Sequence, residues 1–156
     1  MKPELADFGG GCFWGVEEVF RMVHGVTKIT VGYEGGHVDN PTYEQVTTHT
    51  TGHAETVQIE FDPNEVSYER LLEIFFMHID PTQLDSADTV NVGENYRSVI
   101  FYHNDAQKKA AEEMIKKLQE KTHRKIVTEV VAAQTFWHAE EYHQKYLLKR
   151  NLGVCT

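Results

Sequence analysis

Three consecutive glycines precede a cysteine and two aromatic residues, and this run, Gly9 to Gly15, constrains the chain more than any other stretch. Glycines adopt backbone conformations closed to other residues and leave their N–H groups uncovered. After the run, apolar residues recur at helical spacing as far as Val23, which predicts a helix from about Cys12 to Val23. Cys12 would then lie at the N-terminus of that helix.

A helix N-terminus favours a negative charge, because its first N–H groups are unpaired and the helix dipole is positive there. The thiolate is the nucleophilic form of cysteine, and in such settings thiol pKa values fall from about 8.5 to roughly 3.5–7.5. Cys12 is therefore a candidate nucleophile, and the rings of Phe13 and Trp14 could wall a pocket for a small apolar group. The alternative is that Cys12 is a small buried residue and both rings belong to the core.

The size and charge of the chain limit its function. Its 156 residues fit one domain, 1–156, and the net charge of -9 argues against binding to nucleic acid or to an anionic membrane. It shows neither a secretory leader nor a membrane-spanning stretch, so we expect a soluble cytoplasmic protein unless a leader has been removed. Two cysteines, Cys12 and Cys155, are too few for the usual structural zinc sites, and a permanent disulfide is not expected in a reducing cytosol.

Hydrophobic patterns of two kinds follow one another along the chain. Period-two alternation predicts strands over residues 5–8, 27–33, 55–61, 97–102 and 126–132. Helical spacing predicts helices over residues 12–23, 68–78, 104–120 and 139–149, with one further turn at 43–46. We therefore expect an α+β two-layer sandwich, in which helices cover a mixed or antiparallel sheet, with long irregular loops and a flexible C-terminal tail over residues 149–156.

Glu55 is a candidate proton donor. It begins a predicted strand whose alternate residues are apolar, and period two sends its side chain toward the same layer. An inward carboxyl group is costly unless it is protonated or partnered, and a raised pKa makes it a general acid. The alternation leaves open a solvated glutamate at the strand edge. Tyr43 and Tyr96 lie in irregular stretches and could aim hydroxyl groups at a small oxygen atom, or could rest on the core.

The histidines offer two further readings. His49 and His53 are four residues apart, and His138 and His143 five apart, but neither pair has a third ligand nearby, so we expect no metal and no cofactor. A Cys12–His53 pair for acyl transfer lacks a marked third group to orient the base.

Five separated motifs occur along the chain: Gly9 to Gly15 with Val16-Glu17-Glu18, Asn40-Pro41-Thr42-Tyr43, Thr51-Gly52-His53-Ala54-Glu55, Asn95-Tyr96-Arg97-Ser98, and Ala139-Glu140-Glu141-Tyr142-His143. Together they resemble a type A peptide methionine sulfoxide reductase, and the match runs from Phe8 to about Tyr146. The resemblance implies a ferredoxin-like core and reduction of the S epimer of methionine sulfoxide, free or in proteins.

The resemblance also implies roles for named residues. Cys12 would be the nucleophile, Glu55 the acid that protonates the sulfoxide oxygen, and Tyr43 and Tyr96 hydroxyl donors to that oxygen. Such chemistry needs a thiolate and a neutral carboxyl group on either side of the sulfoxide, because sulfoxide sulfur is a poor electrophile until its oxygen is protonated or hydrogen-bonded. Attack would leave methionine and a sulfenic acid on Cys12.

Phe13 and Trp14 would form the pocket for the methyl group on sulfur. Cys155 would condense with the sulfenic acid of Cys12, and thioredoxin or a similar dithiol would reduce the disulfide. Many relatives carry two cysteines near the C-terminus, whereas this chain has only Cys155 there, so a relay through a third thiol is ruled out. We expect a monomer whose partners are oxidised proteins, free methionine sulfoxide and the dithiol reductant.

One position departs from the family pattern. Asn91 stands where the family usually has an aspartate, and asparagine accepts and donates hydrogen bonds but carries no charge. We expect Asn91 to serve the site as a hydrogen-bonding group only. Two other functions compete with the reductase: a thiol peroxidase or acyltransferase that uses Cys12, and a non-catalytic module that binds methionine-bearing peptides. Assays with sulfoxide and with peroxide separate them.

Overall fold

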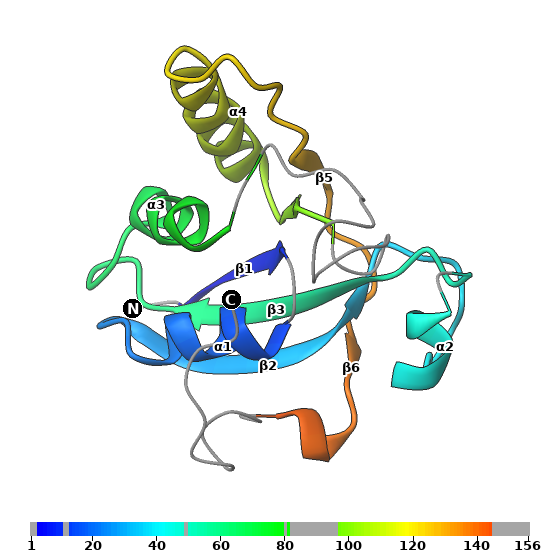
Figure 1. Cartoon of the computed structure of the whole chain (residues 1–156). Coiled ribbons are helices and arrows are strands. Elements are labelled where there is room, and N and C mark those ends of the chain that lie inside the picture. Colours follow the sequence, from blue (N-terminus) through cyan, green and yellow to red (C-terminus); the bar gives the residue numbers. More distant parts are fainter. Residues whose placement is uncertain (1–2, 11–12, 49, 80, 82–96, 145–156) are drawn as a thin grey trace.

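The computed structural model describes residues 3–10, 13–48, 50–79, 81 and 97–144. Six strands and four α-helices form in these ranges, followed by one short 3-10 helix (Figure 1). In chain order the elements are β1 (Glu4–Gly9), α1 (Phe13–Arg21), β2 (Val26–Glu34), α2 (Tyr43–Thr47), β3 (Ala54–Phe61), α3 (Tyr68–His78), β4 (Val99–Tyr102), α4 (Asp105–Gln119), β5 (Glu129–Ala132), β6 (Trp137–His138) and η2 (Glu141–His143).

The strands form one mixed sheet in the order β5-β4-β1-β3-β2-β6. Neighbouring strands are antiparallel except for β4 and β5, which are parallel. The four central strands, with α1 between β1 and β2 and α3 between β3 and β4, have the β-α-β-β-α-β order of a ferredoxin-like fold. The predicted α+β class with a ferredoxin-like core is confirmed.

Two helices cover one face of the sheet, and the core lies between them and the strands. Phe8 on β1 stacks on Phe20 of α1 and Phe75 of α3, with ring centroids 5.7 and 4.9 Å apart, so both helices pack on the same face (Figure 1). All three rings are fully buried. Helix α3 begins and ends at the predicted residues, because Ser67 caps its first turn and its apolar residues leave little polar surface.

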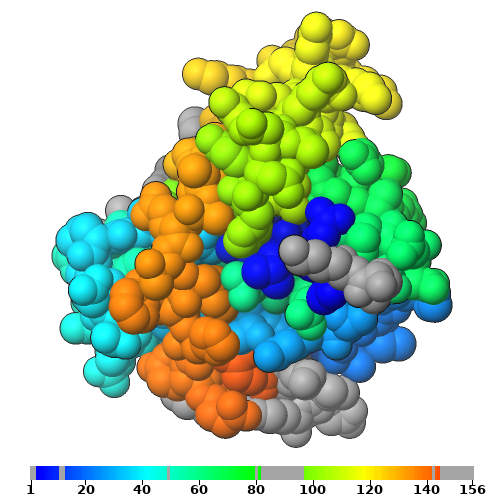
Figure 2. Space-filling model, turned by 180° about the vertical axis from the view of Figure 1, so that it is seen from behind, coloured from blue at the N-terminus to red at the C-terminus, as the bar shows by residue number. Residues whose placement is uncertain are grey.

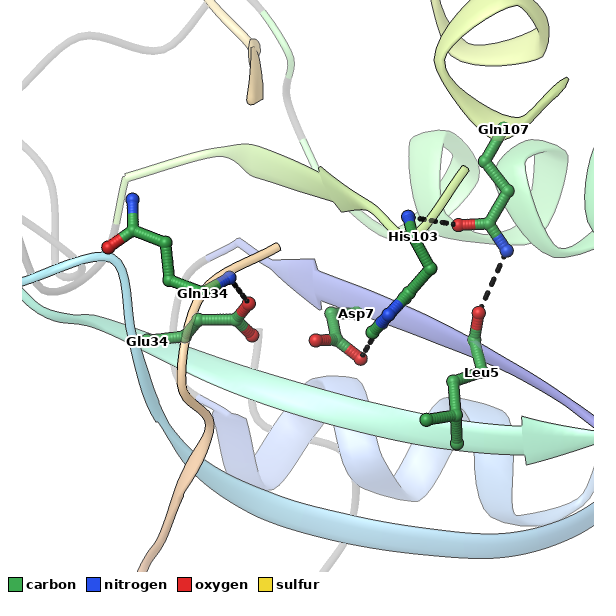
Figure 3. A network of polar contacts seen from close by, with 6 residues as sticks. All are labelled: Leu5, Asp7, Glu34, His103, Gln107 and Gln134. Atoms are coloured by element: carbon green, nitrogen blue, oxygen red, sulfur yellow. Dashed lines mark hydrogen bonds and ion pairs between the residues drawn. The ribbon is translucent and has the colours of Figure 1, made fainter. Parts of the chain in front are cut away.

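The opposite face of the sheet carries a polar network (Figure 3). Asp7, one residue from Phe8 on β1, turns away from the helices, and His103 Nε2 lies 3.0 Å from its Oδ1. Glu34 at the end of β2 points toward Asp7 and accepts a hydrogen bond from the Gln134 N–H at 2.9 Å. Both carboxyl groups are fully buried. Viewed from behind, the orange segment that follows α4 crosses the molecule beside the cyan segment after β2 (Figure 2).

The predicted C-terminal helix over residues 139–149 is wrong for the part that the structure describes. Only η2 is helical there, and it has three residues. The sequence around it bonds to β2 instead: the Ala139 N–H donates to the Val31 carbonyl at 2.9 Å, and the Gln144 side chain bonds to both backbone groups of Val31. Residues 145–149 of this predicted helix, and the predicted tail at 149–156, lie outside the described residues.

A side chain caps helix α4 at its start. Asn104 accepts a hydrogen bond from the Gln107 N–H at 2.9 Å, and the Gln107 side chain accepts from the His103 N–H at 2.9 Å. The Gln107 amide also donates to the Leu5 carbonyl at 2.8 Å, which ties α4 to the first strand.

Among the helices that the structure describes, none has the length and hydrophobicity of a membrane span.

Candidate active site

A buried carboxyl group lies at the start of helix α1. Glu55, on β3, is 1% exposed, and its Oε1 accepts a hydrogen bond from the Phe13 N–H at 3.2 Å. Because the first N–H groups of a helix have no partner within it, the carboxyl group satisfies one of them. The predicted inward direction of Glu55 is therefore confirmed, and the solvated alternative is wrong.

The structure describes helix α1 from Phe13 to Arg21, within the predicted range of about Cys12 to Val23. Its first residue therefore follows Cys12 directly in the chain. Cys12 itself lies outside the described residues, as do Tyr96, Asn91 and Cys155. Of the predicted site residues, the structure places Phe13, Trp14, Tyr43 and Glu55, and it brings these four together.

The aromatic side chains of this site form one cluster with a histidine. The Phe13 ring centroid lies 6.3 Å from Trp14 and 6.5 Å from Tyr43, and Trp14 and Tyr43 stack at 6.2 Å. His143, from η2, lies 4.4 Å from the Tyr43 ring, and its Nδ1 accepts a hydrogen bond from the Trp14 Nε1–H at 3.0 Å. Phe13 is almost fully buried, whereas Trp14 and Tyr43 are half-buried. The cluster thus forms an apolar wall beside Glu55, with two of its rings reaching the surface.

Tyr43 is held by the short helix α2. Thr42 caps this helix: its hydroxyl accepts from the Gln45 N–H at 3.2 Å, and the Gln45 side chain accepts from the Thr42 N–H at 2.9 Å. Asn40 turns the chain into this start with a φ of 48°, a left-handed conformation that asparagine tolerates better than most residues. The motif Asn40-Pro41-Thr42-Tyr43 is therefore a helix start that sets the direction of the Tyr43 ring.

His53 is a structural residue rather than a base. Its Nδ1 accepts a hydrogen bond from the Gly36 N–H at 3.0 Å, and its Nε2 lies 2.7 Å from the Val38 carbonyl, so both ring nitrogens bond to the backbone after β2. Gly36 is required there, since a Cβ would lie 2.4 Å from the Thr51 carbonyl oxygen. The Cys12–His53 alternative for acyl transfer is not supported.

The two histidine pairs do not form a metal site in the described part of the chain. His49 lies outside the described residues, His138 is exposed, and His143 is buried against Trp14. Where side chains are described, no three histidine, cysteine, aspartate or glutamate residues are placed to hold a metal ion.

The two residues after Tyr96 are firmly placed. Arg97 Nε lies 3.1 Å from Glu129 Oε2, and the hydroxyl groups of Ser98 and Thr128 are 2.8 Å apart. Both contacts fix the start of β4 to the segment that leads into β5. The motif Asn95-Tyr96-Arg97-Ser98 therefore includes residues that hold the chain in register directly after Tyr96.

Sequence reasoning gave no role to Glu140 or to the Trp14 contact of His143. Glu140 Oε1 accepts from the Tyr33 hydroxyl at 3.0 Å, and its Oε2 accepts from the Tyr43 N–H at 3.1 Å. The only signal in the sequence was that both residues belong to the motif Ala139 to His143. That motif marks the region without showing which distant residues it contacts.

The chain is similar to known proteins over most of its length. A family model described as "Peptide methionine sulfoxide reductase" matches residues 4–156. A protein from Acidobacterium capsulatum with the name peptide methionine sulfoxide reductase MsrA is 55% identical over 152 residues, which cover 96% of this chain and 97% of that protein.

Two solved structures have a fold similar to that of this chain. The chain is similar to reduced Mxr1 from Saccharomyces cerevisiae, with a TM-score of 0.89 and 34% identity over 99% of this chain and 89% of that one. Mxr1 in complex with Trx2 is also similar, with a TM-score of 0.66 and 25% identity over 93% of this chain and 85% of that one.

Proposed function

Because the chain belongs to the peptide methionine sulfoxide reductase family, we propose that it reduces the S epimer of methionine sulfoxide, in proteins and as the free amino acid. The enzyme class follows from the family: the chain is an oxidoreductase that acts on methionine sulfoxide. The observation that carries the finer proposal is the contact between Glu55 and the Phe13 N–H, since Phe13 directly follows the proposed nucleophile Cys12.

The proposed reaction reduces the substrate sulfur by two electrons and oxidises the Cys12 sulfur by two. The Cys12 thiolate attacks the sulfoxide sulfur while protonated Glu55 gives a proton to the sulfoxide oxygen. Attack forms a bond between the Cys12 sulfur and the substrate sulfur, the S–O bond breaks, and the oxygen leaves as water after taking up a second proton. Water then attacks the Cys12 sulfur and breaks the new S–S bond, so that methionine leaves reduced, one proton is released and Cys12 carries a sulfenic acid. The buried carboxyl group of Glu55 lies at the start of α1, beside the residue that follows Cys12, so it is close enough to the nucleophile to act on the same substrate. The helix dipole at this N-terminus favours the thiolate form of a cysteine.

The aromatic cluster supplies the proposed substrate site. The rings of Phe13 and Trp14 would hold the methyl group on sulfur, and the Tyr43 and Tyr96 hydroxyls would donate to the sulfoxide oxygen. Support for this comes from the stacking of Trp14 on Tyr43 and from the proximity of both rings to Phe13, whose N–H is bonded to Glu55. Asn91 would contribute a hydrogen bond without a charge.

Recycling of the enzyme is proposed to use the second cysteine. The Cys155 thiol condenses with the Cys12 sulfenic acid, one water leaves, and a disulfide forms that a thioredoxin reduces. The similarity to Mxr1, whose structure in complex with Trx2 is known, supports a reductant of this type. We propose that the enzyme is a cytoplasmic monomer with one catalytic domain, 1–156, whose tail at 149–156 carries Cys155.

The assay supplies the purified chain with dithiothreitol and each epimer of methionine sulfoxide, first free and then within a short peptide. We expect methionine from the S epimer in both forms, none from the R epimer, and none with Cys12→Ser. Equal reduction of both epimers would contradict the stereochemical part of the proposal. Consumption of hydrogen peroxide, with no methionine formed from either epimer, would contradict the reductase assignment of the site.

A further inference from the structure

The segment that carries Glu140 is held against β2 at both ends. Before Glu140, β6 pairs with Gly32 and Tyr33, and the Ala139 N–H donates to the Val31 carbonyl at 2.9 Å. After it, the Gln144 side chain accepts from the Val31 N–H at 3.0 Å and donates to the Val31 carbonyl at 2.9 Å. We refer to residues 137–144 as the strap. The close fit of the strap depends on Gly32, because a Cβ there would lie 2.2 Å from the Trp137 carbonyl oxygen.

Glu140 connects the strap to two other elements. Its carboxyl group accepts from the hydroxyl of fully buried Tyr33 on β2 and from the Tyr43 N–H at the first residue of α2. Partial burial opposes the charged form, but the hydrogen bonds from the N–H groups of Tyr43 and Glu140 and from the Tyr33 hydroxyl prevail and hold the pKa of Glu140 below its ordinary value. The group is therefore a carboxylate at neutral pH, which makes both bonds charge-assisted.

Helix α2 needs such a connection. It has five residues, Tyr43–Thr47, and helices this short are not stable in isolation. Its capping box lies within the segment itself, so it fixes the helix start without fixing where the helix sits. The position of α2 depends on buried Val46, on the contacts of the Tyr43 ring with the aromatic cluster and on the bond between Glu140 and the Tyr43 N–H.

From these contacts we propose that Glu140 is a positioning residue for the reaction: it fixes the start of α2 so that the Tyr43 hydroxyl is aimed at the sulfoxide oxygen. This inference rests on the proposed function, in which Tyr43 donates to that oxygen. Glu140 acts through Tyr43 and does not touch the substrate. Because a displacement of about 1 Å in a donor can cost up to a hundredfold in rate, loss of the connection lowers kcat more than it raises KM.

The chain offers a matched control. Glu44 is an exposed glutamate on the same helix, one residue from Tyr43, and its side chain makes no hydrogen bond among the contacts described. Glu44→Ala removes a carboxylate of the same charge without touching the connection. The conservative variant Glu140→Gln keeps an oxygen to accept from the Tyr43 N–H and an amide to donate to the Tyr33 hydroxyl.

The experiment measures kcat, KM and the rate of Cys12 alkylation by iodoacetamide for each variant. We expect Glu140→Ala to lower kcat about tenfold with less than a threefold change in KM and in alkylation. We expect Glu140→Gln and Glu44→Ala to stay within threefold of the parent kcat. In the Tyr43→Phe background, Glu140→Ala should cost less than a further twofold, since the hydroxyl that it positions is absent.

Several results would overturn the inference. One is a kcat for Glu140→Ala equal to that of Glu44→Ala, and another is a tenfold loss from Glu140→Ala that persists in full in the Tyr43→Phe background. If Glu140→Ala does not fold, Tyr33→Phe takes its place: it removes one of the two bonds, with an expected loss of about threefold that disappears in the Tyr43→Phe background. A loss that remains there refutes the inference. Absence of sulfoxide reduction by the parent chain would instead refute the proposed function.

Discussion

Oε1 of Glu55 lies 3.2 Å from the backbone nitrogen of Phe13, so a buried carboxyl group of β3 caps the start of α1. The two residues are 42 positions apart in the chain and meet because β1, which leads into α1, pairs with β3. Gly9, at the end of β1, is opposite Thr56, the residue after Glu55. The glycine run begins at Gly9, the last residue of β1, and therefore lies one residue along β3 from Glu55. In this way the sheet brings together the first and third motifs of the sequence.

The buried carboxyl groups of Asp7 and Glu34, on the face of the sheet away from α1 and α3, predict that stability depends on pH. Burial, the hydrogen bond with Asp7 and the charge of Asp7 raise the pKa of Glu34 to about 10, against 4.5 for an ordinary glutamate. The folded chain therefore holds a proton that the unfolded chain has lost between these values. This contribution to stability is fully present below pH 4.5 and is lost as the pH rises toward 10.

Urea unfolding at several pH values tests this prediction. We expect the free energy of unfolding to fall by about 2 kcal/mol between pH 7 and pH 9, since one such group contributes at most roughly 1.4 kcal/mol per pH unit. Glu34→Gln imitates the protonated form, so its decline should be much shallower and it should be more stable than the parent at pH 9. The control Glu4→Gln, at an exposed position of β1, should follow the parent. An equally steep decline in Glu34→Gln would show that a group other than Glu34 causes the loss of stability.

The two tryptophans allow a matched test of the aromatic wall. Trp14 donates to His143 and stacks on Tyr43, whereas Trp137 on β6 has no ring contact with this cluster among those described. We expect Trp14→Phe to raise KM for methionine sulfoxide about tenfold, because lost apolar contact and the lost donor together are worth roughly 1–3 kcal/mol. Trp137→Phe should leave KM within twofold. Equal KM values in the two variants would remove Trp14 from the substrate site.

If Cys155 is the recycling thiol, one turnover should end in a defined product. Without reductant, we expect the parent chain to release about one methionine and to lose both thiols to a Cys12–Cys155 disulfide. Cys155→Ser should release the same amount of methionine and leave a sulfenic acid on Cys12 that dimedone traps. Peptide mapping by mass spectrometry distinguishes the two products. A free Cys155 thiol in the parent after turnover would remove the recycling step and leave the first step intact.

Asn91 provides a test of charge at the site. If it acts only as a hydrogen-bonding group, Asn91→Asp, which keeps an acceptor of the same size, should stay within threefold of the parent kcat, whereas Asn91→Ala should lose about tenfold. The steady-state rate with dithiothreitol measures both. Unchanged turnover in both variants would show that the position has no role.

The sequence predicted the elements with strong local signals and missed those that depend on distant partners. Helix α3 was predicted with its observed bounds, because its apolar spacing and the Ser67 cap are both local features. The sequence predicts a helix over residues 139–149, which includes most of the strap, whereas the hydrogen bonds that hold the strap come from Val31, more than 100 residues earlier. Periodicity carries no information about such contacts.

The same reason explains which site residues could be found. Strand alternation made Glu55 a candidate and left its direction open, and Phe13 and Trp14 were candidates because they follow the glycine run. The resemblance to the family supplied the role of each. Glu140 contacts Tyr33 and Tyr43 across 107 and 97 residues, and Glu34 contacts Gln134 across 100. Each of these glutamates looks like an ordinary polar residue until the sheet brings its partners together.

The most direct test of the account compares the single-turnover rate of methionine formation from the S sulfoxide in the parent and in Glu55→Gln, with the iodoacetamide reactivity of Cys12 measured alongside. Glutamine keeps the acceptor for the Phe13 N–H but donates no acidic proton. The account predicts a rate about a hundredfold or more below the parent, as expected for loss of a general acid, while Cys12 is alkylated at a similar rate. A parent-like rate of methionine formation in Glu55→Gln would contradict it.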